Sequence, residues 1–119
     1  MMATVNVDAA VRDLHARIGG RATALVSCEG TMLSGAMPGE VYPETFAVMC
    51  ATVFGAAATA HAELGRAPPR LVVVEGLDTI TILVACGRGA LLVAVVDPAA
   101  NVPAVRGEME KFAGLLRAN

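Results

Sequence analysis

Apolar residues recur along this chain with two different periods, and the change of period divides it into helices and strands. Near the N-terminus the spacing alternates between four and three residues, the period of one helix face, at Val7, Val11, Leu14 and Ile18. The same spacing returns near the C-terminus, at Val105, Met109, Phe112 and Leu116. Between these stripes, short apolar runs bounded by glycine, proline and acidic residues predict strands.

The expected order of elements is α-β-β-α-β-β-β-α. They are a helix at 6–18, strands at 22–28 and 31–36, a helix at 43–64, strands at 71–75, 79–86 and 90–96, and a last helix through 105–116. Short turns join consecutive strands, such as a predicted two-residue turn at Glu29-Gly30, and they favour an antiparallel sheet covered by helices. No repeat and no long linker divides the sequence, so we expect a single α+β domain over residues 1–119.

Two of the predicted strands are apolar on both faces, and each has a different explanation. The strand at 90–96 has the composition of a central strand covered on both sides. The strand formed by Leu71, Val72, Val73 and Val74 begins a three-strand meander, which places it at the edge of the sheet. Because a bare apolar edge invites aggregation, we expect it to pair with the same strand of a second copy, making a homodimer.

The second predicted helix has no charged residue from Thr45 to Ala62, which is about the length of a membrane span. Alanine, threonine and glycine dominate it, and it lacks leucine, isoleucine and a basic flank on either immediate side. This composition favours a helix packed between protein surfaces and not inserted in a membrane.

Three weakly polar stripes run along this helix, and we assign one role to each. We expect the chain's own sheet to cover Phe46, Cys50, Val53, Ala57, Ala60 and Leu64. We assign to the homodimer interface, together with the edge strand, Ala47, Ala51, Phe54, Ala58 and His61. We assign to a further protein partner Val48, Thr52, Gly55 and Thr59, because contiguous uncharged surface is typical of binding sites.

Composition and charge exclude several classes of function. The net charge is -2 and no basic stripe is present, so nothing would attract a nucleic acid. Charged residues make up only 17% of the chain, which favours a surface partly covered by another protein. Residues 1–19 lack the long apolar core of a signal peptide, so we expect a cytoplasmic protein.

The metal-binding and nucleophilic side chains lack the spacing of a site. His15 and His61 lie on different helices without further ligands nearby, so we expect no metal and no cofactor. No Cys-x-x-Cys motif occurs among Cys28, Cys50 and Cys86, and we interpret all three as structural residues in strands or on the second helix.

The turns offer no catalytic group either. Residues 87–89 (Gly-Arg-Gly) join strand to strand, which indicates a hairpin and not a phosphate loop leading into a helix. Arg88 at its tip is better explained as a solvated arginine than as one supplied to a partner GTPase. The turn carboxylates Glu29, Glu75 and Asp78 are expected to be solvated, so we expect no enzyme activity.

Several local strings resemble the Roadblock family, named for a dynein light chain. Residues 20–30 (GRATALVSCEG) are similar to the family's opening strand and turn. The alanine-rich second helix, the strand at 71–75 and the start of the last helix at 101–106 follow in the family's order. Two positions depart from the pattern: Glu29 replaces the usual turn aspartate, and Pro103 stands where many members have glycine.

The resemblance implies a profilin-like fold, with a five-stranded antiparallel sheet, one helix on one face and two on the other. It also implies a homodimer joined through the middle strand and the second helix, which binds a small Ras-like GTPase or associates with motor and signalling complexes. The alternative function is a sensory or scaffold module that holds another signalling protein without a GTPase.

Overall fold

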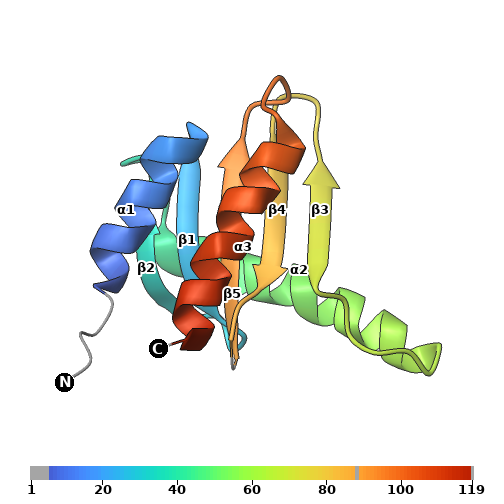
Figure 1. Cartoon of the computed structure of the whole chain (residues 1–119). Coiled ribbons are helices and arrows are strands. Elements are labelled where there is room, and N and C mark those ends of the chain that lie inside the picture. Colours follow the sequence, from blue (N-terminus) through green and yellow to red (C-terminus); the bar gives the residue numbers. More distant parts are fainter. Residues whose placement is uncertain (1–5, 88, 119) are drawn as a thin grey trace.

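A computed structural model describes residues 6–87 and 89–118, and it contains the predicted elements in the predicted order (Figure 1). They are α1 (Val7–Ile18), β1 (Ala22–Ser27), β2 (Met32–Ala36), α2 (Pro43–Glu63), β3 (Leu71–Glu75), β4 (Ile80–Ala85), β5 (Ala90–Val96) and α3 (Val102–Ala118). Predicted and observed boundaries differ by a few residues at most, and β3 and β5 have the predicted bounds.

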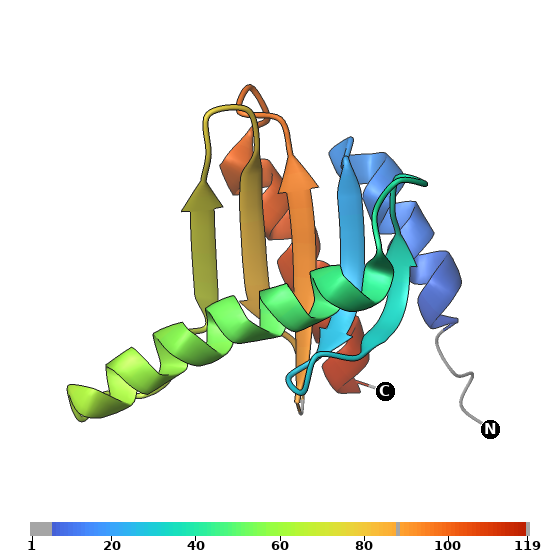
Figure 2. The same cartoon turned by 180° about the vertical axis from the view of Figure 1, so that it is seen from behind.

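The five strands form one antiparallel sheet in the order β2-β1-β5-β4-β3. Helices α1 and α3 cover one face, and α2 crosses the other (Figures 1 and 2). This layered arrangement confirms the fold class that the resemblance implied. The central position of β5 and the edge position of β3 confirm the positions that the sequence predicted for these two strands.

Each face of the sheet has its own apolar core, and β5 contributes to both. Leu92 packs with residues of α1 and α3, such as Leu14 and Met109. Leu91 and Val93 point to the opposite face, where they pack with α2. Side chains that alternate between two covered faces explain why this strand is apolar throughout.

Local chemistry accounts for the start and end of the first helix. The Asn6 side-chain oxygen accepts a hydrogen bond from the Ala9 backbone N–H at 3.1 Å. Gly19 ends the helix in the left-handed conformation, with φ of 62°. Asn101 caps α3 in the same way as Asn6, by accepting from the Ala104 N–H at 3.1 Å.

The turn between β1 and β2 corrects a prediction. It contains three residues, Cys28, Glu29 and Gly30, and not two, because β1 ends at Ser27 and the Ser27 N–H donates to the Thr31 carbonyl at 2.9 Å. Gly30 takes a φ of 96°, which suits the glycine that closes a three-residue hairpin loop. Cys28 is therefore an exposed turn residue, whereas the sequence placed it in a strand.

We expect Gly30→Ala to lower the free energy of unfolding by about 2 kcal/mol or more, as urea denaturation measures it. The positive φ disfavours a side chain, and an added Cβ would lie 3.2 Å from the Cα of Val48 in α2. Gly39→Ala is the matched control, because Gly39 has no positive φ and a methyl group added there would meet no atom within 4 Å. Equal stability of the two variants would contradict the role of Gly30 in seating α2.

Candidate protein-interaction surface

Helix α2 is long, uncharged between Glu44 and Glu63, and only partly covered by its own chain. It begins with Pro43 in its first turn, crosses the sheet obliquely and continues beyond the edge strand β3 (Figure 2). Three of its residues, Ala47, Cys50 and Phe54, are buried. By length and composition α2 could cross a membrane, but its contact with the sheet agrees with a helix that faces protein.

The underside of α2 differs from the predicted one. Val53 is 40% exposed and Leu64 is 75% exposed, whereas the sequence placed both on the side facing the sheet. Phe54 instead packs with Leu83, Leu91 and Val93 of the strands. Ala60 and Leu64 fail for a second reason, since this end of the helix lies beyond the edge of the sheet and is exposed (Figure 2).

Because α2 turns a different side to the sheet than the sequence predicted, part of the stripe assigned to a homodimer interface is not available for it. Ala47 and Phe54 are buried against the chain's own strands, so they are core residues and cannot contact a second copy. Ala51, Ala58 and His61 remain partly exposed. Of the stripe, only these three residues can still belong to an interface.

Strand β3 presents a free edge of the sheet. Its hydrogen-bonding partner is β4, in a register that pairs Val73 with Ile82 and Val74 with Thr81. The side chains of Val73 and Val74 are 43% and 45% exposed. In the part of the chain that the structure describes, no element pairs with the other side of β3.

The stripe assigned to a protein partner occupies exposed positions of α2. Val48, Thr52, Gly55 and Thr59 are all exposed, and the Thr52 hydroxyl donates to the Val48 carbonyl at 2.7 Å. Two further apolar residues, Met49 at 53% and Val53 at 40% exposure, extend this surface. Met49 had no role assigned from the sequence, and Val53 was expected to face the sheet. Uncharged residues occur on every side of this helix, so periodicity gives no signal for its outer side.

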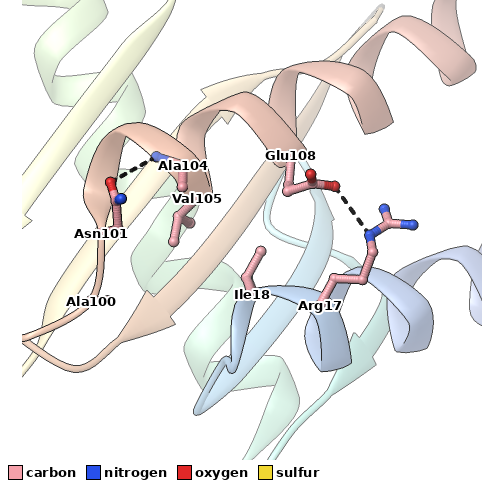
Figure 3. Close-up of a pocket in the computed structure, with 7 residues that line it drawn as sticks. All are labelled: Arg17, Ile18, Ala100, Asn101, Ala104, Val105 and Glu108. Carbon is pink, nitrogen blue, oxygen red and sulfur yellow. Dashed lines mark hydrogen bonds and ion pairs between the residues drawn. The ribbon is translucent and has the colours of Figure 1, made fainter.

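A hollow of about 310 Å³, lined by both charged and apolar residues, lies on the opposite face, between the end of α1 and the start of α3 (Figure 3). Arg17 Nε and Glu108 Oε1 are 3.1 Å apart along its rim, so their charges neutralise each other. The Asn101 oxygen is already bonded to the Ala104 N–H. Nothing in this arrangement resembles a nucleophile with a base beside it.

Each histidine makes a hydrogen bond within the chain, one to a side chain and one to the backbone. His15 Nδ1 is hydrogen-bonded to the buried Thr23 hydroxyl at 2.9 Å, and His61 Nδ1 donates to the Ala67 carbonyl at 3.0 Å. Within residues 6–87 and 89–118, no group of three His, Cys, Asp or Glu side chains could hold a metal ion. Arg88 lies outside the described residues.

The turn carboxylates do not form a pair. Glu29 lies in the turn after β1, at one end of the sheet, whereas Glu75 and Asp78 lie at the end where β3 turns into β4 (Figure 1). All three are exposed. Acid–base catalysis by two of them together is therefore not supported by their positions.

Burial distinguishes the cysteines from one another. Cys50 and Cys86 are buried, as expected for structural residues. Burial raises the pKa of the Cys50 thiol from 9.0 to about 11, because the thiolate would lose its hydration against the sheet.

The raised pKa of Cys50 predicts a loss of stability in alkali. Between pH 9 and 11 the unfolded chain releases a proton that the native state retains, so the stability present below pH 9 falls through this window. We expect the free energy of unfolding of the wild type to fall by roughly 2 kcal/mol more than that of Cys50→Ala between pH 9 and 11, as urea denaturation measures it. At neutral pH we expect Cys50→Ala to lower the free energy of unfolding by about 1 kcal/mol and Cys28→Ala to lower it less, and we expect both variants to bind the partner. Identical pH profiles of wild type and Cys50→Ala would contradict this account.

Comparison with known proteins agrees with this geometry. A sequence model of the Roadblock/LC7 domain matches residues 8–96, from α1 to the end of β5. The chain belongs to the Roadblock/LC7 family. The protein MJ0310 of Methanocaldococcus jannaschii is 28% identical over 112 residues, which are 94% of this chain and 97% of that protein.

Two solved structures show the same fold. Myxococcus xanthus MglB superposes with a TM-score of 0.90 at 18% identity, covering 98% of this chain and 96% of that one. A Roadblock/LC7 domain from Streptomyces avermitilis has a TM-score of 0.88 at 21% identity, with 96% and 97% covered. A further MglB structure is described as having a tetrameric arrangement. At such identities the similarity shows a shared fold.

Proposed function

We propose that this chain is a non-catalytic homodimeric platform that binds and regulates a small Ras-like GTPase in the cytoplasm. One observation carries the proposal: the exposed, uncharged outer face of α2 runs past an unpaired strand edge. Membership in the Roadblock/LC7 family supports it, because the resemblance of the sequence to that family implied a GTPase partner.

The homodimer follows from the free edge of β3. Antiparallel pairing of two β3 strands about a two-fold axis perpendicular to the sheets joins them into one sheet, with both α2 helices on the same face. The part of α2 beyond β3 would then lie over the partner's strands, where His61 gains a surface to cover it. The tetrameric arrangement of an MglB structure supports self-association as a property of this fold.

The platform works by binding alone. The sequence has no Gly-Lys-Ser/Thr string, so the chain does not itself bind nucleotide as a P-loop GTPase does. Regulation by a partner without catalytic groups requires that it bind one conformation of the GTPase more tightly than the other. The ratio of the two affinities sets the largest shift that it can produce.

Affinity capture tests this function. The tagged chain is used as bait in extract of its native cell, once with a GTP analogue and once with GDP, and mass spectrometry identifies the captured proteins. We expect one small GTPase to be enriched about tenfold or more in one of the two nucleotide states. Equally poor capture of every GTPase in both states would reject the proposal and leave a scaffold for another signalling protein.

A further inference from the structure

A second hollow, of about 360 Å³, lies beneath α2 on the side of the sheet where β1 and β4 end. Phe54 and three small residues of the helix, Ala51, Gly55 and Ala58, form one wall. The strand ends and the segment Pro68–Pro69 between α2 and β3 form the others. Because three of the four helix residues in this wall are alanine or glycine, the chain's own side chains leave the space unfilled.

The apolar walls of this hollow determine which class of ligand can bind in it. Among the described residues, no charged or amide side chain lines the hollow, and the only side-chain heteroatom is the sulfur of Cys28. A charged ligand would lose its hydration there and find no partner. A peptide segment would bring backbone N–H and C=O groups that need partners as well, so these walls do not suit it.

The size of the hollow suits a small molecule. Its volume falls within the roughly 300–1,000 Å³ of ordinary ligand sites and is more than twice that of a dry engineered cavity of about 150 Å³ that binds benzene. We propose that this cavity is a binding site for a small, uncharged apolar molecule, of the size of a one- or two-ring aromatic or a short acyl chain.

Cys28 allows a direct test on the purified chain. Its thiol lines the cavity and is exposed, whereas Cys50 and Cys86 are buried, so disulfide probes attach at Cys28. The probes are the symmetric disulfides of benzyl mercaptan, which is apolar, and of cysteamine, which is charged. The Cys28 thiolate attacks one sulfur of the probe, forms a mixed disulfide with that half and releases the other half as free thiol. Intact-mass spectrometry measures the adduct against rising 2-mercaptoethanol.

For each adduct we take the concentration of 2-mercaptoethanol that removes half of it, and the preference is the benzyl value divided by the aminoethyl value. We expect this preference to be about tenfold larger in the folded chain than in the urea-unfolded chain. Ala58→Leu fills the cavity and removes this preference. Ala62→Leu, at an exposed position of the same helix, is the matched control and retains it. Circular dichroism verifies that each variant is folded, and Ala51→Leu replaces Ala58→Leu if the latter unfolds.

Two results would overturn the proposal: no preference in the wild type, or an unchanged preference in the folded variant with the filled cavity. A protein that uses this hollow only as a contact surface gives the first of these results. The experiment contains no GTPase, so its outcome does not depend on whether the chain binds one.

Discussion

Val73→Lys is expected to convert the proposed homodimer into a monomer or a precipitate. Val73 is 43% exposed at the free edge of β3, and its pairing with Ile82 places it on the face of the sheet covered by α1 and α3. In a paired dimer two lysines would enter the same seam, and each would replace apolar area that the partner covers. We expect the dissociation constant to rise about a hundredfold or more, as light scattering measures it across a dilution series.

Leu77→Lys is the matched control for this charge. Leu77 is fully exposed in the turn between β3 and β4, so the same substitution there alters no strand edge. We expect its dissociation constant to equal that of the wild type. A wild-type chain that is a well-behaved monomer at micromolar concentration would end the homodimer hypothesis, and so would a Val73→Lys dimer as stable as the control.

Thr52→Glu is expected to abolish capture of the proposed GTPase partner and to leave the proposed dimer intact. Thr52 lies in the middle of the uncharged outer surface of α2, and glutamate is a better helix former than threonine, so folding is not at risk. A carboxylate buried there by a partner would lose its hydration, and α2 has no Lys or Arg between Glu44 and Glu63 to compensate its charge. We expect the affinity to fall about a hundredfold or more. Pull-down of the captured GTPase measures it, with light scattering on the same sample.

Ala9→Glu adds the same charge on the opposite face of the sheet. Ala9 is exposed in the first turn of α1, where a carboxylate is tolerated well near the positive end of the helix. We expect this variant to capture the GTPase as the wild type does. Retained capture by Thr52→Glu would remove the outer face of α2 from the partner site, and a monomeric Thr52→Glu would place Thr52 in the dimer seam instead.

The sequence by itself determined the elements and much of their arrangement. Regular apolar spacing defined α1 and α3, and caps such as Asn6 defined where they begin. Apolar side chains on both faces of β5 required a covered, central strand, and the meander that starts at Leu71 required an edge. These features depend on local periodicity and on short connections, which the order of residues alone contains.

Only the tertiary structure decided which side of α2 faces the sheet. Small or uncharged residues occupy every side of this helix, so its stripes differ little in hydrophobicity and sequence periodicity cannot rank them. The choice came from the fit of Phe54 among Leu83, Leu91 and Val93, three residues from β4 and β5 that lie far from α2 in the sequence. The sequence also did not predict that α2 extends past β3 or that the space beside Ala51 and Ala58 is unfilled. Both features depend on how a straight helix crosses a sheet that is narrower than the helix is long.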